Sequence, residues 1–553
     1  MSYQQPPQYN QQYPQQQQYG QQQYGQPQYQ KPAEYQQPYQ QPYQQQYQQQ
    51  PAPNAYQQQY QQPPPNFQHS PQNSDRPSAQ SNDPLIPKKE DRFKASAAKD
   101  VWAILLWVVC LTGSVAVSFY AYTNMNKAPS DATKVRTTTT SSSNGSTDIN
   151  LNVPTKDMII GFSISAVAGF IFSLVYFLLI QKFAGTLITI TMVIACVLNF
   201  VVAGIFFALG QIVPAIIWLI LAAIIAWCYW SWRSRIPFAK VMLKNVTSIT
   251  GKYPATIFVG VIGLVFQLAF VTYWAFGAVS ITQLVQNKVV SQGVGYGLLV
   301  YMVFVFYWTS QIIGNAVHIT NCGLFATYYF QGVSDGNGGV TLAVSNPTAK
   351  AAKRAMTSGL GPNCYGSLLI ALIETLKFII NNARNDQSND NIACQLLLCC
   401  IACILSMFED LLEYFNRYAF AQVAIYGKDY CSAAKDTWEL AKSRGIDAII
   451  NDNLISNVLS IGSLIIGLLT GGIALLYVKS STDFEGTVVA YVFFGVIALF
   501  IGIVEFSVLA GVIDSGVVTT FVCLAEDPQA LLNTKPQLYQ KIREVYPQVV
   551  LGF

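Results

Sequence analysis

Residues 487–520, TVVAYVFFGVIALFIGIVEFSVLAGVIDSGVVTT, form a segment long and apolar enough to cross a lipid bilayer. A transmembrane helix needs about 20 apolar residues to span about 30 Å of hydrocarbon. The sequence therefore predicts an all-α integral membrane protein, a polytopic bundle of about ten transmembrane helices. The other predicted spans lie at approximately 101–122, 158–180, 184–208, 212–232, 254–280, 294–327, 364–382, 392–408 and 454–478.

The polar part of the chain lies mostly at its ends. Hydrophobic residues make up 51% of the 553 residues and charged residues only 11%, yet residues 1–83 are mostly Gln, Tyr and Pro. Such a tract buries too little apolar surface to offset chain entropy, so we expect a disordered cytosolic tail. Residues 84–100 form a basic juxtamembrane linker suited to anionic lipid headgroups. The predicted ten-span membrane domain covers 101–525, and a second cytosolic tail covers 526–553.

One short pattern in the N-terminal tail suggests a protein partner. Pro6, Pro7 and Tyr9 match the P-P-x-Y form that WW domains bind as polyproline II. The match can also arise by chance in a tract built from these residues. The candidate partners are therefore the lipid bilayer and a WW-domain protein, while a net charge of +4 does not indicate nucleic acid.

The positive charges indicate the orientation of the spans. Cytoplasmic loops of membrane proteins carry an excess of Lys and Arg. With the N-terminus inside, the inner loops after the second span carry most of these residues. Asn144, in Asn-Gly-Ser, then becomes a glycosylation acceptor in the long outer loop 123–157. An even number of spans places both termini in the cytosol.

Few ionisable side chains lie within the predicted spans, where such groups are costly. Glu374 and Lys377 are three residues apart in the seventh span and can pair on one helix face, as a gate or as a structural clamp. Glu505 and Asp514 lie in the tenth span without a basic neighbour on their own helix. Either acid could bind a cation or carry a proton, or could simply hydrogen-bond another helix.

A second polar group follows the eighth span. Asp410, Glu413 and Arg417 share one helical face at its cytosolic end, and Glu413 and Arg417 have the favourable i, i+4 order. This geometry suits an inner gate or a structural clamp. In the sixth span, His318 either bonds to a neighbouring helix or relays a proton.

Aromatic residues are abundant in the spans. Quaternary ammonium groups bind to aromatic faces through cation–π attraction, whereas aromatics at span ends more often form interfacial belts. Trp274 and Trp308 lie deeper than the belt positions, so they are candidates for the wall of a solute site.

Two patterns resemble ion sites but do not support one. GVGYG at 293–297 resembles a potassium filter, which requires four copies around an axis. The cysteines at 394, 399, 400 and 403 have no acid or histidine close by and are typical packing residues. No nucleotide-binding fingerprint is present. We therefore expect no cofactor, no metal and no enzymatic activity.

Five blocks of the chain are distinctive in sequence. They are YFNRYAFAQVAIYGKDYCSAAKDTW (414–438), WCYWSWRSRIPFAKVMLK (227–244), NAVHITNCGLFATYYF (315–330), GPNCYGSLLIALIETLKFI (361–379) and IDSGVVTTFVCLAEDP (513–528). These blocks resemble the choline transporter-like family, most closely its fungal pH-nine-sensitive members. The resemblance covers about 100–530 and implies a ten-span solute carrier of the plasma membrane, some of whose animal relatives move choline or ethanolamine. At Lys377 the chain departs from the Arg usual in animal members.

Two functional hypotheses follow. The first is a plasma-membrane secondary transporter of a small organic solute, a cation or amine of the choline type, with Glu505 or Asp514 supplying charge. The alternative is a non-transporting membrane scaffold that recruits partners through the Gln/Tyr/Pro-rich tail.

Overall fold

The computed structural model of the chain describes residues 92–93, 97–124, 155–334, 340–385, 392–480 and 488–545. All of them belong to the second of two units, Pro84–Phe553. The glycosylation acceptor Asn144 and the pattern at Pro6, Pro7 and Tyr9 lie outside the described residues, so both stay predictions.

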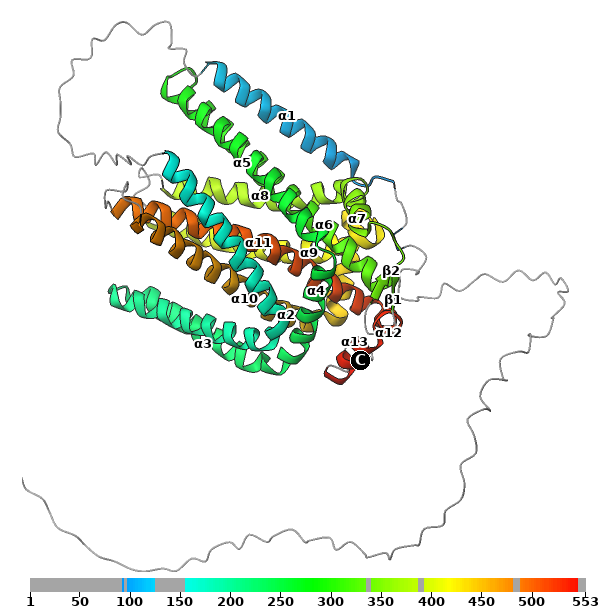
Figure 1. Cartoon of the computed structure of the whole chain (residues 1–553). Coiled ribbons are helices and arrows are strands. Elements are labelled where there is room, and N and C mark those ends of the chain that lie inside the picture. The colour runs from blue at the N-terminus through cyan, green and yellow to red at the C-terminus, as the bar shows by residue number, and fades with distance from the viewer. Residues whose placement is uncertain are drawn as a thin grey trace, which may run out of the picture. The chain divides into compact units, whose positions relative to one another are not determined.

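Helices make up nearly all of the described chain (Figure 1). The long ones are α1 (Val101–Asn124), α2 (Thr155–Ala208), α3 (Ile212–Trp232), α4 (Ile236–Lys252), α5 (Ala255–Gln286), α6 (Gln292–Gln331), α8 (Leu360–Asn385), α9 (Ile392–Tyr426), α10 (Tyr430–Ser480) and α11 (Val488–Glu526). The shorter elements are the 3₁₀ turn η2 (Arg233–Arg235), α7 (Pro347–Met356), α12 (Pro528–Thr534), α13 (Pro536–Val545), and strands β1 (Gly332–Ser334) and β2 (Val340–Leu342), which pair antiparallel.

The all-α membrane architecture is confirmed. Within the described residues, eight helices are long and apolar enough to cross a membrane, and they overlap every predicted span except 392–408. One of them, Ile160–Ala208, contains two predicted spans, and its backbone leaves the helical conformation at Phe183 (φ −121°, ψ 28°). The segment 392–408 is the first half of α9, part of whose side chains lie outside the description.

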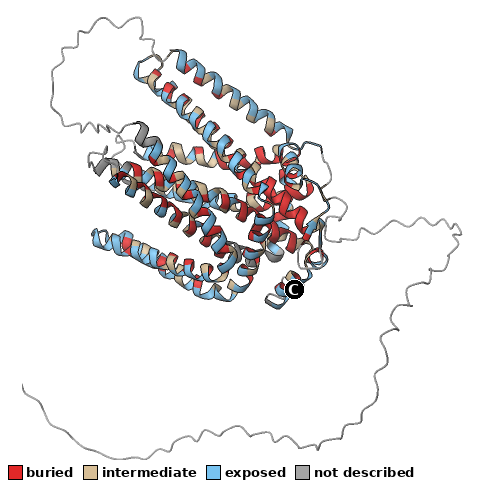
Figure 2. Ribbon diagram, viewed as in Figure 1, coloured by how far each residue is buried: buried red, intermediate tan, exposed pale blue. Residues whose placement is uncertain are grey.

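The sixth and tenth spans continue well beyond a bilayer. With 40 and 39 residues, α6 and α11 are each about 60 Å long at 1.5 Å per residue, roughly twice the hydrocarbon thickness. Their C-terminal parts, together with that of α9, are continuously buried over 318–329, 418–426 and 515–524. We call these three runs the packed end, which lies near α7, α12 and the hairpin (Figure 2).

Away from the packed end, the helices expose large apolar side chains to their surroundings. Leu105, Phe170 and Phe266 are 63%, 58% and 64% exposed, for example. Soluble monomers rarely expose contiguous apolar surface on this scale, whereas lipid-facing helices do. This difference in burial separates a membrane region from the packed end, where other parts of the same chain cover the helices.

Glycines bring α10 and α11 into close contact. A Cβ atom at Gly467 would lie 2.9 Å from the carbonyl oxygen of Leu499, and one at Gly471 would lie 3.1 Å from that of Gly495. Backbone atoms cannot move aside as a side chain can. The small-xxx-small pattern at these positions is thus a helix-packing device, as its spacing predicts.

Candidate functional site: a cavity between α5, α6 and α11

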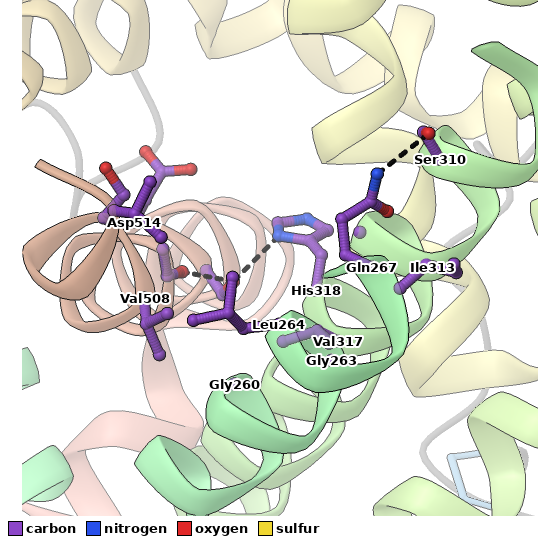
Figure 3. Close-up of a pocket in the computed structure, with 15 residues that line it drawn as sticks. Gly260, Gly263, Leu264, Gln267, Ser310, Ile313, Val317, His318, Val508 and Asp514 are labelled. Carbon is purple, nitrogen blue, oxygen red and sulfur yellow. Dashed lines mark hydrogen bonds between the residues drawn. The ribbon is translucent and has the colours of Figure 1, made fainter. Parts of the chain in front are cut away.

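A cavity of about 420 Å³ lies between α5, α6 and α11 (Figure 3). Its size falls within the range of sites that hold small molecules. Its walls are mostly apolar or small, with a few polar groups among them. The lining residues are Gly260, Gly263, Leu264, Gln267, Ser310, Ile313, Gly314, Val317, His318, Val504, Ser507, Val508, Gly511, Asp514 and Ser515.

Four glycines shape this cavity in two different ways. At Gly314 and Gly511 no heavy atom lies within 4 Å of where a Cβ would stand, so both positions open onto free space. A Cβ at Gly260 would instead lie 2.7 Å from Cγ1 of Val508, and one at Gly263 would clash with Cγ2 of Val317. The first pair leaves the cavity open, while the second lets α5 approach its neighbours.

Polar groups of the wall come from each of the three helices. Gln267 on α5 donates from Nε2 to Oγ of Ser310 on α6 at 2.9 Å (Figure 3). On α11, Ser507 donates its hydroxyl to the carbonyl of Ile503 at 2.7 Å. Among the described residues that line the cavity, Asp514 is the only acidic one. A positively charged solute would therefore find its counter-charge at this end of the cavity.

An ion pair between α9 and α11 occupies that end. Nη1 of Arg417 lies 3.0 Å and 2.9 Å from the two carboxylate oxygens of Asp514. Both side chains are partly exposed, at 29% and 19%. Sequence spacing suggests Glu413 as the partner of Arg417, and the fold adds an acid 97 positions away. The contact joins the predicted gate residue to the predicted solute residue.

His318 on α6 contacts the same two helices, α9 and α11. Its Nε2 lies 3.0 Å from the carbonyl oxygen of Arg417 and must carry a hydrogen, because a carbonyl only accepts. Its Nδ1 lies 2.9 Å from Oγ of Ser515. A neutral ring accepts there from the Ser515 hydroxyl. A protonated ring donates instead, and the hydroxyl then donates to the carbonyl of Gly511, 2.7 Å away.

Both predicted roles of His318 are therefore compatible with its surroundings. It bonds two neighbouring helices, and rotation of a single hydroxyl lets it keep these bonds in either protonation state. His318 is also 9% exposed and lines the cavity, so a proton on it would lie close to Asp514.

A second ion-pair group links α8 to α9. Lys377 binds Glu409 and lies 3.9 Å from Glu374, which agrees with the i, i+3 pair expected from the sequence. Glu409 is 7% exposed, whereas Asp410 is exposed. The gate candidates from the sequence leave Glu409 out. Its position four residues before Glu413, one helical turn away, is the signal that could have included it.

The two tryptophans do not line the cavity. Trp308 is fully buried, donates from Nε1 to the carbonyl of Cys364 at 2.9 Å, and packs against Phe304. Trp274 donates to the carbonyl of Met302 at 2.9 Å and lies 4.6 Å from the ring of Phe306. An aromatic wall formed by Trp274 and Trp308 is thus not a feature of this cavity.

Glu505 lies on a different face of α11 and is not among the lining residues. Its Oε2 points at Gly169 of α2 so closely that a Cβ there would clash with it. Oε2 is buried and has no hydrogen-bond partner within the described part of the chain. The two acids of the tenth span therefore occupy separate environments.

One short pattern near the hairpin resembles a catalytic motif. Residues 332–336, GVSDG, match the G-x-S-x-G of hydrolases. In that elbow the serine stands between a strand and a helix. Here Ser334 ends β1, and the next described element is the strand β2, which pairs with β1.

Comparison with known proteins identifies relatives over most of the chain. The family model described as plasma-membrane choline transporter matches residues 216–529. Protein PNS1 of Gibberella zeae is 33% identical over 480 residues, which cover 83% of this chain and 85% of that protein. Protein PNS1 of Mycosarcoma maydis is 34% identical over 71% of this chain and 74% of its own length. A CTL-like protein of Dictyostelium discoideum is 36% identical over 62% of this chain and 58% of its own length.

Proposed function

The chain belongs to the choline transporter-like family of membrane transporters, and we propose that it carries a small organic cation or amine through the cavity between α5, α6 and α11. The observation that carries this proposal is Asp514, the single acid among the described residues of a mostly apolar wall. A carboxylate attracts the charged nitrogen, and the apolar wall accommodates its alkyl groups. Gln267 and Ser310 offer hydrogen bonds to a hydroxyl or amine of the solute.

The ion pair between Arg417 and Asp514 is the proposed inner gate. A solute cation that binds Asp514 competes with the guanidinium of Arg417, since both need the same carboxylate. Binding therefore weakens the link between α9 and α11 at the end of the cavity. The group formed by Glu374, Lys377 and Glu409 would act as a second clamp on α9. Asp410 and Glu413 lie on α9 between Glu409 of this clamp and Arg417 of the gate.

The proposed location is the plasma membrane with both termini in the cytosol. The positive charge of the inner loops supports this orientation. The packed end would then face the cytosol, with the loop that contains Asn144 outside. A non-transporting scaffold remains the competing proposal, in which the tail with Pro6, Pro7 and Tyr9 would recruit a WW-domain partner.

Uptake into proteoliposomes tests the proposal. We expect the wild-type protein to take up radiolabelled choline or ethanolamine, and to discriminate against 3,3-dimethylbutanol, the uncharged analogue of choline. Gly314→Leu and Gly511→Leu should each reduce uptake at least tenfold, because both side chains would project into the free space of the cavity. Gly472→Leu on α10 is the matched control, since its Cβ position is also open but lies outside the cavity lining.

Two results would contradict the proposal. Absence of uptake across a panel of amines would favour the scaffold. Unchanged uptake by both cavity variants would place the solute path elsewhere in the bundle.

A further inference from the structure

Helix α11 presents two chemically different faces. Val504, Ser507, Gly511 and Asp514 follow one another at helical spacing and line the cavity. Glu505, one position after Val504, is rotated by about 100° and is directed at α2. Helix α11 thus connects the cavity with the carboxyl group of Glu505, which lies outside the cavity.

The surroundings of Glu505 provide no counter-charge. Gly169 on α2 stands against its Oε2, and Oγ1 of Thr470 on α10 lies 3.2 Å from the same Cβ position. Thr470 already donates its hydroxyl to the carbonyl of Ile466 at 2.8 Å. Among the described residues, no charged side chain acts on Glu505. The carboxyl group is therefore held by small and neutral neighbours.

A further buried polar group lies nearby on α2. Ser173, one turn after Gly169, is 5% exposed, and its Oγ has no hydrogen-bond partner in the described chain. Among the described residues, the phenols of Tyr176 and Tyr477 lie where α2 and α10 approach each other or α11, and phenols are neutral at ordinary pH. Tyr176 is engaged with the carbonyl of Val458 at 3.0 Å.

An ionised carboxylate is not stable in such a place. Burying a charge without an opposite charge or hydrogen-bond donors costs many kcal/mol, so the group takes up a proton instead. The arrangement seen here accommodates the neutral acid. The residue as a whole is half-buried, but the ionised form would require water or another donor at Oε2, which is the buried oxygen that stands against Gly169.

We propose that Glu505 is a proton-binding site, separate from the solute cavity, whose loading and release drive the movement of solute. The inference rests on the transport function proposed above. A proton from water on one side of the membrane binds the Glu505 carboxylate and later leaves to water on the other side, with no other bond made or broken. Each change shifts α11, which also carries Asp514, and thereby alters the contact between Asp514 and Arg417.

The first test compares driven and undriven transport in proteoliposomes. We expect a pH gradient to increase choline accumulation by wild-type protein. Glu505→Gln should abolish this increase while exchange of labelled for unlabelled choline without a gradient is retained, because the cavity is unaltered. Glu439→Gln, which removes an exposed acid of α10, is the control and should retain both activities.

The second test detects the proton itself and needs no solute. Infrared difference spectra of the purified protein should show a protonated-carboxyl band that responds to pH and is missing in Glu505→Gln. A band that persists in this variant would overturn the proposal. So would gradient-driven uptake that Glu505→Gln leaves unchanged, loss of exchange in that variant, or accumulation that follows a sodium gradient instead.

The outcomes separate the two proposals. If the wild-type protein shows the band but takes up no solute, the proton site is supported and the transport function is contradicted. Uptake that depends on Gly314 and Gly511 but not on Glu505 retains the cavity and contradicts the proton site.

Discussion

At the scale of single residues, the decisive contacts join acids and bases far apart in the chain. Asp514 binds Arg417, and Lys377 binds Glu409 across two helices. The sequence identifies these side chains as costly in a membrane, since it gives both their charge and their position within or beside an apolar segment. It does not identify their partners, because helix spacing shows only neighbours three and four positions away.

A lysine at the packed end gives a prediction at this scale. Lys535 donates to Oδ1 of Asn245 at 2.7 Å and lies over the ring of Tyr328. Burial, and secondarily the charge of Lys252, lowers the pKa of Lys535 from 10.5 to about 8. The unfolded chain therefore binds more protons than the folded one between about pH 8 and 10.5, so this group destabilises the fold below pH 8 and the penalty is relieved as pH rises.

We accordingly expect Lys535→Met to be more stable than wild type at pH 7, by at most about 3 kcal/mol. The lost contacts to Asn245 and Tyr328 reduce the gain. The advantage should shrink steadily from pH 8 to 10.5, as measured by thermal unfolding in detergent. Lys541→Met, at an exposed site on α13, should show no such trend. A pH-independent difference between Lys535→Met and wild type would refute the argument.

At the scale of elements, glycine spacing sets how closely helices approach. Gly467 meets backbone of α11, whereas Gly472 on the same helix α10 has nothing within 4 Å of its Cβ position. The two glycines therefore form a matched pair: both lie on α10, but only Gly467 packs against another helix.

Gly467→Val should lower stability by about 1–3 kcal/mol, because the added side chain forces α10 and α11 apart. Gly472→Val should cost less than half as much, because its side chain enters open space and valine is a better helix former than glycine. Melting temperatures of the two purified variants provide the measurement, and equal losses would show that packing against α11 is not the cause.

The structure differs most from the sequence-based predictions at the ends of the helices. The apolar runs correctly predict where helices lie, but α9 continues to Tyr426, well beyond the predicted span 392–408, and α10 begins at Tyr430, well before the predicted span 454–478. The added turns of α9 over 418–426 are buried, so other parts of the chain cover them. Window-based hydropathy measures transfer to lipid and therefore ends where the lipid ends.

At the scale of the whole molecule, the linker before α1 ties the ends of several helices together. Arg92 forms an ion pair with Asp527 at 3.2 Å, contacts the hydroxyl of Tyr426, and lies 3.8 Å from the ring centroid of Phe330. The side chain of Arg92 is only 9% exposed. Within the predicted lipid-binding linker, this residue thus binds protein instead of headgroups.

Arg92→Gln should lower stability by about 3 kcal/mol, since it leaves Asp527 without its ion-pair partner in a largely buried site. It should also increase the rate of proteolysis after α9 and α11, whose ends the linker holds. Arg543→Gln removes the same charge from an exposed position on α13 and should change neither quantity. If both variants melt alike, the linker contact contributes nothing to the fold.

The sequence alone determined the class of molecule, the order of its spans, the acids within them and the family to which it belongs. These follow from properties carried by local sequence: hydropathy over about 20 residues, charge within a span, and the resemblance of short blocks to a known family. The cavity, its separation from Glu505, and the pairing of Arg417 with Asp514 were decided only by tertiary structure. Each depends on which faces of distant helices meet, and that choice arises from packing among side chains that no local window contains.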